Sequence, residues 1–428
     1  MTAAVAALER SGRKALGRDD LRAAIGYADR ALALDPPSAG QRMEVEMLLV
    51  DGLWRSGDIQ RTREVAERLA EAAEAAKRHD LRGRALHAVF LDVWLGAGRA
   101  EGREAGMALL NQARDELEQA DDQEHLADVL FDLAWDGWWL GDVDRARADW
   151  ERAAEQARKI GDPAREVRAL LRVGATLFQQ GGLAEAQRLL ARAVELSPST
   201  SRLTQTDVSM TRGFDLYITG RNAGDGRAAV EQALAVAEEL GATGLRERGL
   251  QTLGDMDLFD GNLAGAIARY EEQVAILADL GDTGRLPEAD RHLAGALLEA
   301  GAVARAEFHA QRAVDTVGAD DWFTVGSSRF TLGRVRDAQG REEEAGRLIR
   351  EGRETVEGTT FLGELVEFYA HEGAFHLRHG RHQEGERLIV RASELSERLS
   401  GPDSPLRRYI ERVASEARAQ AAAAREAR

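Results

Sequence analysis

Apolar residues recur every three or four positions along most of the chain, which is the spacing of the buried face of an α-helix. The segments 189–196 and 266–274 show this pattern clearly. No stretch alternates apolar and polar residues with an enrichment in β-branched side chains, as a half-buried strand would. The apolar residues are mostly Ala and Leu, which are strong helix formers. The sequence therefore predicts an all-α protein.

Glycines interrupt this helical pattern at regular intervals of about 40 residues. A glycine readily adopts the left-handed conformation that ends one helix and lets the next begin. A second set of glycines lies between the members of the first, so each period contains two helices. All seven prolines fall at predicted helix ends, where proline is tolerated. The first set is Gly57, Gly98, Gly141, Gly181, Gly220, Gly261, Gly301, Gly340 and Gly380, and the second is Gly161, Gly241, Gly281, Gly318 and Gly358.

The segment 173–198, which reads VGATLFQQGGLAEAQRLLARAVELSP, resembles one tetratricopeptide repeat (TPR). Two helices approach to about 8–10 Å only where the crossing residues are small. The matching residues are Gly174 at the helix crossing, Gly181 at the turn, Ala186 and Ala193 in the second helix, and Pro198 at its end. Equivalent residues in other units are the crossing glycines Gly12, Gly213, Gly254, Gly333 and Gly373, the small residues Ala24, Ala146, Ala266, Ala306 and Ala345, and the aromatic residues Trp150 and Tyr270.

The resemblance extends over residues 1–400 in roughly ten units and implies an α-α solenoid, a TPR-like right-handed superhelix. Each module is expected to share its apolar face only with adjacent modules. Residues 401–428 are expected to form a capping helix and a frayed tail. The period of about 40 residues is longer than the common 34, and it resembles the C-terminal repeat arms of bacterial signalling ATPases and cyclases. The chain is then either a whole protein or one arm of a larger one.

The first helix of each pair lines the concave groove in TPR proteins, so this resemblance assigns candidate binding residues. Aligned on the turn at Gly141, the residues Phe131, Asp132, Trp135, Trp138 and Trp139 fall on groove-facing positions. The alternative is that these aromatic side chains fill the core between neighbouring pairs. Equivalent positions of other first helices hold Asp51, Trp54, Asp92, Phe178, Phe214, Tyr217 and Asp255. The recurring carboxylates predict a negative groove that suits a basic or amphipathic partner; the alternative is an ordinary solvated helix face.

Charge and composition exclude several other functions. The net charge of −17 disfavours nucleic acid and anionic membrane surfaces as partners. There are no cysteines, and no apolar stretch is long enough to cross a bilayer, so we expect a cytoplasmic protein. A phosphate-binding loop needs Lys followed by Ser or Thr, and Lys14, Lys77 and Lys159 are followed by other residues. The histidines between 371 and 382 are expected at the surface around a turn, without the spacing of a metal site.

The sequence therefore predicts a protein without catalytic residues, cofactor or metal. Its expected function is that of a scaffold that binds a partner protein or peptide in its concave groove, as a regulatory or sensor arm in bacterial signalling. The alternative is a sensor that closes its aromatic groove residues around a small-molecule effector.

Overall fold

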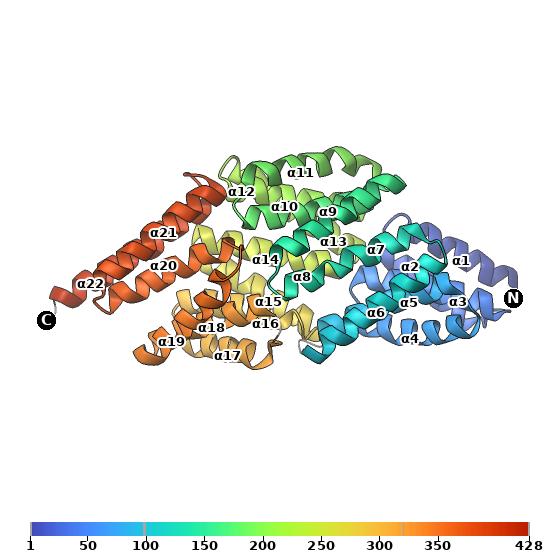
Figure 1. The fold of residues 1–428 in the computed structure, drawn as a ribbon, viewed down its shortest axis with the longest axis horizontal. Helices are drawn as coiled ribbons and strands as arrows, with labels where there is room; N and C mark the ends of the chain where they lie inside the picture. The colour runs from blue at the N-terminus through green and yellow to red at the C-terminus, as the bar shows by residue number, and fades with distance from the viewer. Residues whose placement is uncertain (1, 97–99, 320, 427–428) are drawn as a thin grey trace.

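The computed structural model describes residues 2–96, 100–319 and 321–426, and within these ranges the chain forms helices and no strand. The helices pair in sequence order, and each pair packs against the next. The predicted all-α solenoid of helix pairs is confirmed. Figure 1 shows the pairs stacked into an elongated body with the two termini at opposite ends. None of the helices in these ranges is both long and apolar enough to cross a membrane.

The first helices of the pairs are α1 (Thr2–Leu16), α3 (Ala39–Ser56), α5 (His79–Gly96), α7 (Gln123–Leu133) with its continuation α8 (Trp135–Trp139), α10 (Pro163–Gln179), α12 (Arg202–Ile218), α14 (Thr243–Asp260), α16 (Leu286–Glu299), α18 (Trp322–Ala338) and α20 (Gly363–Arg378). The second helices are α2 (Leu21–Ala33), α4 (Ile59–Ala75), α6 (Ala100–Gln119), α9 (Val143–Ile160), α11 (Leu183–Leu196), α13 (Ala223–Leu240), α15 (Leu263–Asp279), α17 (Val303–Thr316), α19 (Glu342–Glu357) and α21 (His382–Ser400). The short 3-10 helix η1 (Ser197–Ser199) follows α11, and α22 (Pro405–Glu426) follows the last pair.

The turn glycines of the first set end helices as the sequence predicts. All of those within the described ranges have φ between 68° and 84°, and Gly98 lies outside these ranges. In the second set, Gly318 and Gly358 do not adopt the left-handed conformation, and Gly358 has a φ of −71°. Other residues adopt it at helix ends where neither set has a glycine: one lies within the first pair and three lie between successive pairs. They are Asp19, Asp35, Lys77 and Asp121, and aspartate tolerates this conformation better than most residues.

Aspartate also begins many of these helices. The side chain of Asp142 accepts a hydrogen bond from the Arg145 amide at the start of α9, and Asp162 accepts two from the first turn of α10. Asp58, Asp122 and Asp321 cap α4, α7 and α18 in the same way. Each such cap contributes about 1 kcal/mol. Part of the acidic charge of the chain therefore lies at helix N-termini, where the helix dipole favours it.

Small residues allow the two helices of a pair to approach closely. A Cβ atom on Gly213 of α12 would lie 2.7 Å from the carbonyl oxygen of Gly226 in α13, and one on Gly226 would lie 2.5 Å from the carbonyl oxygen of Gly213. Gly373 and Gly385 make the same kind of contact between α20 and α21. Gly174 is different, because the nearest atom to an added Cβ is 3.5 Å away. The small residues predicted after the turns are fully buried, as are Trp150 and Tyr270.

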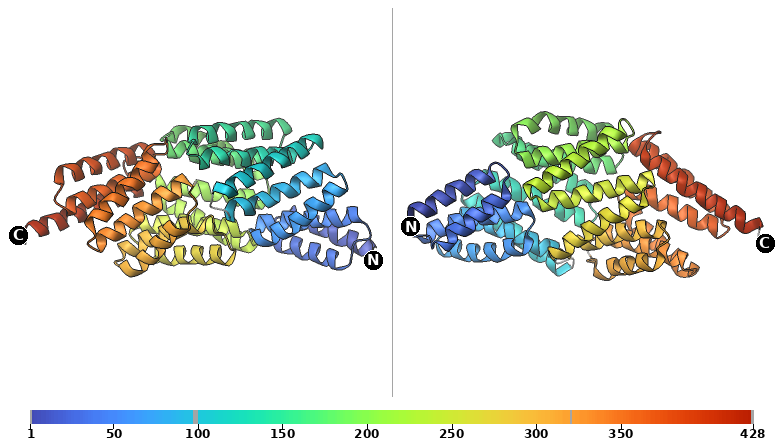
Figure 2. Two further views of the ribbon diagram at one scale, coloured as in Figure 1. Left: turned by 60° about the horizontal axis from the view of Figure 1, so that its bottom comes forward. Right: turned by 180° about the vertical axis from the view of Figure 1, so that it is seen from behind.

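Successive turns of the superhelix also touch, which the sequence analysis did not anticipate. The amide of Leu203 donates to Asp19 Oδ2 at 2.5 Å, and the indole of Trp322 donates to the carbonyl oxygen of Trp138 at 2.6 Å. Each pair of residues is 184 positions apart. Figure 2 likewise shows the N-terminal helices beside the α12–α14 region. Trp138 also packs on Phe361, with the ring centres 5.4 Å apart. The expectation that modules share apolar faces only with adjacent modules is therefore wrong where successive turns touch.

The last helix, α22, packs on α20 and α21 and reaches back to α14. Its residues Tyr409 and Ile410 are fully buried. The Tyr409 hydroxyl donates to Glu299 Oε1 at 2.6 Å and lies 2.8 Å from His371 Nε2. His371 is therefore a buried residue, and the expectation that it lies at the surface is wrong.

Candidate binding site on the inner face

Two hollows open on the inner face of the superhelix, and first helices supply most of their walls. The first, which we call the aromatic hollow, has a volume of about 420 Å³ and lies among α8, α10, α12, α14, α16, α18 and α20. The second, the charge-paired hollow, has a volume of about 530 Å³ and lies among α3, α5, α7, α10 and α12. Helix α10 contributes to both, because Arg165 and Arg168 line the charge-paired hollow and Arg172 lines the aromatic hollow.

Aromatic rings from distant repeats form much of the wall of the aromatic hollow. Trp135 and Trp138 come from α8, and Phe323 and Phe361 come from the next superhelical turn. Trp135 packs edge-on against the buried Trp150 at 5.0 Å, and Phe323 packs edge-on against Phe361 at 5.2 Å. The rings of α8 thus serve two purposes: one side of each packs on core residues, and another side faces the hollow.

Most charged groups of the aromatic hollow are already paired. Arg291 in α16 donates to Glu288 Oε1 at 2.6 Å and lies 2.9 Å from Glu364 Oε1. His292 Nε2 lies 3.1 Å from the same Glu288 oxygen. Burial opposes ionisation of Glu288, but Arg291 and His292 outweigh it and hold the pKa of that carboxyl well below its usual range. The Tyr270 hydroxyl donates to Asp255 Oδ1 at 2.6 Å.

Two ionisable side chains that line this hollow make neither a hydrogen bond nor an ion pair with any described residue. They are Arg172 in α10 and Glu367 in α20. The Arg172 guanidinium stacks over the Trp135 ring at 5.0 Å. Burial lowers its pKa to about 10, and the neighbouring Arg248 adds to this effect. Burial raises the pKa of the Glu367 carboxyl to about 8, with further contributions from Glu364 and Asp255.

The raised pKa of Glu367 makes a pH-dependent stability prediction. A folded-state pKa above the ordinary carboxyl value means that the folded protein keeps a proton which the unfolded chain loses, so stability falls as the pH rises from about 5 to 8. The groups that face this carboxyl are Glu364 on α20, Asp255 on α14, Tyr270 on α15, Arg291 and His292 on α16, and Tyr409 on α22. Glu367→Gln mimics the protonated form and should remove this contribution.

We therefore expect Glu367→Gln to match the wild type at pH 5 and to exceed its stability at pH 8 by at least about 1.4 kcal/mol, the equivalent of one pKa unit. Urea unfolding followed by circular dichroism at both pH values measures this difference. Glu231→Gln, a change of an exposed glutamate on α13, is the control and should show no pH-dependent gain. If Glu367→Gln and the wild type differed in unfolding free energy by the same amount at pH 5 and pH 8, the assigned protonation state would be wrong.

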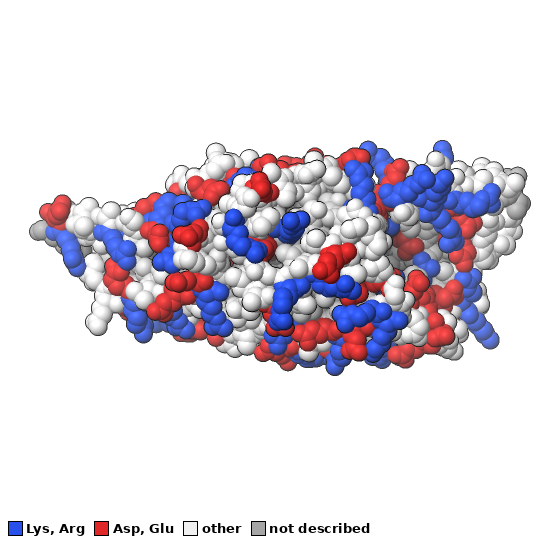
Figure 3. Space-filling model, turned by 90° about the horizontal axis from the view of Figure 1, so that it is seen from above, with Lys and Arg blue, Asp and Glu red and all other residues white. Residues whose placement is uncertain are grey.

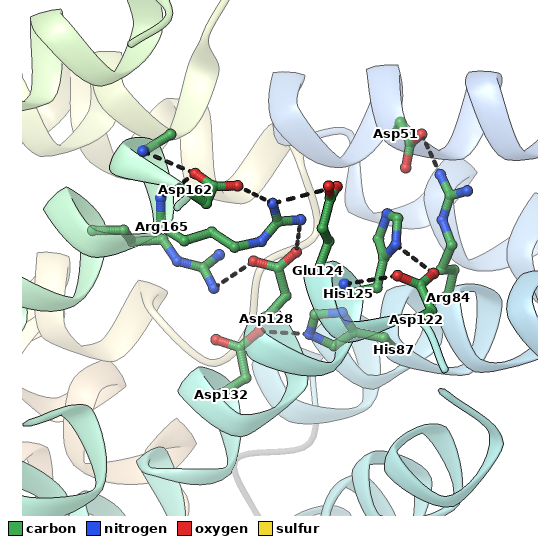
Figure 4. Close-up of polar contacts among 12 residues, drawn as sticks. Asp51, Arg84, His87, Asp122, Glu124, His125, Asp128, Asp132, Asp162 and Arg165 are labelled. Carbon is green, nitrogen blue, oxygen red and sulfur yellow. Dashed lines mark hydrogen bonds and ion pairs between the residues drawn. The ribbon is translucent and has the colours of Figure 1, made fainter. Parts of the chain in front are cut away.

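The charge-paired hollow is lined by carboxylates that already have partners (Figure 4). Asp128 in α7 lies 2.8 Å from both Arg165 and Arg168 of α10. Asp51 Oδ2 accepts a hydrogen bond from Arg84 at 2.8 Å. Burial opposes ionisation of Asp128, but the two arginines outweigh it and lower the pKa of that carboxyl.

At the charge-paired hollow, these pairings correct the prediction of a negative groove. The recurring carboxylates there are paired with arginine and histidine side chains of a neighbouring first helix, 33 to 45 residues away in the sequence. The face of the molecule seen from above also carries charges of both signs (Figure 3). Seen from above in Figure 3, acidic and basic side chains intermingle and do not gather into a patch of one sign.

The predicted groove residues separate into lining and core positions. Trp135, Trp138, Phe178, Phe214 and Asp255 line the aromatic hollow, and Asp51 and Trp54 line the charge-paired hollow. The side chains of Asp92 and Trp139 lie outside the described residues.

Three predicted groove residues are instead buried in the core. Phe131 packs on Trp150 beneath the Arg168 guanidinium, which lies 4.0 Å from its ring centre. Asp132 Oδ2 lies 2.7 Å from His87 Nε2. The Tyr217 hydroxyl donates to the carbonyl oxygen of Met256 at 2.8 Å. Their helices do line the inner face, but these three positions are turned toward neighbouring helices.

Sequence reasoning missed Arg172 and Glu367. A signal was available for the first, because Arg165, Arg168 and Arg172 follow the three- and four-residue spacing of one helix face. Glu364 and Glu367 show the same spacing on α20. In a chain with 131 Lys, Arg, Asp and Glu residues such spacings are frequent, so only the tertiary contacts distinguish these two side chains.

Comparisons with known proteins place the fold. No family model matches the chain, and no curated protein matches it. The structure is similar to that of a Rap protein complexed with competence and sporulation factor, with a TM-score of 0.52 and 12% identity over 84% of this chain and 99% of that one. The fold is a tetratricopeptide-like solenoid. A weaker similarity is to yeast Tom70, with a TM-score of 0.37 and 14% identity over 97% of this chain and 96% of that one. At these identities the likeness concerns the fold alone.

Proposed function

We propose that this protein is a non-catalytic scaffold that binds a partner protein or peptide on its inner face. Residues 1–400 form the binding superhelix, and residues 401–428 close its C-terminal end through α22. The observation that carries the proposal is the convergence of first helices from many repeats on two adjoining hollows. Aromatic rings contribute to the walls of both, and the aromatic hollow adds the unpaired ionisable groups of Arg172 and Glu367.

The two hollows follow one another along α10, which gives an extended ligand a continuous path. Arg165 and Arg172 are seven residues apart, so their side chains lie about 10 Å apart along the helix axis. Tandem helical repeats characteristically present such extended concave surfaces. The similar Rap structure was determined with competence and sporulation factor bound, which is in keeping with a ligand-binding role for this fold.

The pairing of the groove carboxylates changes the expected partner. Asp51, Asp128 and Asp132 are already engaged, so a strongly basic peptide would have to compete with the protein's own arginine and histidine side chains. An amphipathic peptide with few charges avoids this competition and still gains from the aromatic walls. We therefore favour an amphipathic partner over a basic one.

A second candidate function is a sensor for a small-molecule effector. The aromatic hollow, at about 420 Å³, falls in the size range of ordinary small-molecule sites. Hydrogen exchange distinguishes the two functions. A peptide should slow exchange in first helices around both hollows, from α3 to α20, whereas a compact effector should protect only those around the aromatic hollow.

We also propose a setting for the protein. The repeat period of about 40 residues resembles that of the repeat arms of bacterial signalling proteins, and the scarcity of lysine beside abundant arginine is typical of a GC-rich bacterial genome. In that setting, occupancy of the groove would change the curvature of the superhelix and so reach a partner protein in the cytoplasm. Small-angle scattering with and without a bound peptide would measure such a change.

A filled hollow tests the binding function directly. Ala175 is exposed and lines the aromatic hollow, so Ala175→Trp adds an indole there without removing a native contact. We expect affinity selection from pools of short synthetic peptides to retain binders on the wild type. Their affinity for Ala175→Trp should fall by at least about tenfold, or 1.4 kcal/mol.

The matched control is Ala184→Trp, which places the same side chain at an exposed position of the second helix α11. It should bind the selected peptides as the wild type does. Both variants should keep the helix content of the wild type by circular dichroism. Failure of the wild type to retain any peptide would contradict the proposed function, and equal loss in both variants would exclude the aromatic hollow as the site.

A further inference from the structure

We propose that the aromatic hollow recognises a zwitterionic ligand of short-peptide size, with its carboxylate at Arg172 and its ammonium group at Glu367. This inference rests on the second candidate function, a compact ligand held in the aromatic hollow, and assigns that ligand a chemistry. It is carried by three observations: an unpaired cation, an unpaired carboxyl group, and an apolar wall between them.

Arg172 supplies the cationic end because its neighbours are already engaged. Asp207, the carboxylate that acts most on it, pairs with Arg248, and Arg168 on the same helix face pairs with Asp128. No described residue offers Arg172 an acceptor, and its guanidinium is held by the Trp135 ring at 5.0 Å. A guanidinium binds a carboxylate through two parallel hydrogen bonds, which makes a ligand carboxylate its natural complement.

Glu367 supplies the carboxyl end, because its neighbours are likewise engaged. Glu364, one helical turn earlier, is paired with Arg291, and Asp255 accepts a hydrogen bond from Tyr270. Glu367 is left without a partner, and the nearby charges of Glu364 and Asp255 disfavour its ionised form. A ligand ammonium group would relieve this repulsion and donate hydrogen bonds to these carboxyl groups. Its positive charge would then favour the ionised form of Glu367.

The two ends lie on helices that meet at one point. The amide of Leu362 donates to the carbonyl oxygen of Gln179 at 2.7 Å, which brings the start of α20 against the end of α10. From this contact Arg172 lies about 10 Å back along α10, and Glu367 lies about 7 Å along α20, at 1.5 Å per residue. Phe178 and Phe361, which flank the contact, line the hollow. A ligand with charged ends and an apolar middle fits this arrangement.

Blocking either end of the ligand tests the proposal. Peptides selected on the wild type would be compared with their N-acetylated and C-amidated forms by isothermal titration calorimetry. We expect each block to weaken binding by at least about tenfold. Glu367→Gln should abolish the effect of acetylation and keep that of amidation, and Arg172→Gln should do the reverse.

Two exposed residues outside the hollows provide matched controls. Glu231→Gln on α13 and Arg387→Gln on α21 make the same chemical changes. Both variants should still bind the free peptides more tightly than the acetylated and the amidated forms. If peptides bind but their blocked forms bind equally well, the end recognition is wrong and the binding function stands. If no peptide is retained, both proposals fail. If Glu367→Gln and Arg172→Gln each lose the preference for both free ends equally, the two side chains support the fold of the hollow and do not bind the ligand's ends.

Discussion

Replacing Trp150 with alanine is expected to lower the free energy of unfolding by about 3–5 kcal/mol, the usual cost of deleting a large buried aromatic side chain. The indole is 1% exposed, and it is the base on which the rings of α7 and α8 rest. Trp135 lies 5.0 Å from it and Phe131 and Trp138 lie 6.3 Å from it. Its Nε1 donates to the carbonyl oxygen of Phe131 at 3.2 Å, so the variant also leaves a buried acceptor without its donor.

Urea unfolding followed by circular dichroism measures this loss. Trp150→Phe retains a ring but removes the hydrogen bond, and it should lose clearly less stability than the alanine variant. Leu140→Ala is the surface control, because Leu140 is 52% exposed and its truncation should change stability by less than about 0.5 kcal/mol. A loss below 1 kcal/mol for Trp150→Ala would mean that the rings of α8 are supported from elsewhere.

The second large effect is expected at the close crossing of α12 and α13. Gly226→Ala should destabilise the protein by about 1–3 kcal/mol, the usual cost of overpacking. Its Cβ would lie 2.5 Å from the carbonyl oxygen of Gly213 and 2.7 Å from the amide nitrogen of Tyr217. Both are backbone atoms, so neither can move aside without displacing α12, whose Tyr217 hydroxyl is bonded to α14.

Gly174→Ala is the matched control, because the same substitution there should have the opposite sign. An added Cβ at Gly174 meets ordinary van der Waals contact at 3.5 Å. Alanine favours the helix interior over glycine by about 0.8–1.0 kcal/mol, so this variant should gain stability. Thermal unfolding of the two variants beside the wild type gives both signs. Destabilisation by Gly174→Ala would show that α10 and α11 are packed as tightly as α12 and α13.

The sequence by itself determined the helices, their pairing and where most of them end. These features depend on local signals: the spacing of apolar residues, the left-handed glycines such as Gly141, and small crossing residues such as Gly213. Each acts within one repeat, and each recurs often enough to be recognised. The sequence did not mark a helix end where another residue adopts the left-handed conformation in place of glycine, as at Lys77 and Asp121.

Only the tertiary structure decided which residues face the inner hollows and which of their charges are free. The recurring carboxylates predicted a negative groove, but Asp128 is neutralised by Arg165 and Arg168, which lie 37 and 40 residues away. The contact between Trp138 and Trp322 spans 184 residues. Such contacts depend on the small rotation between successive repeats, which accumulates along the superhelix and leaves no mark in any single repeat. Arg172 and Glu367 are therefore distinguished by what their neighbours bind, and not by their own sequence positions.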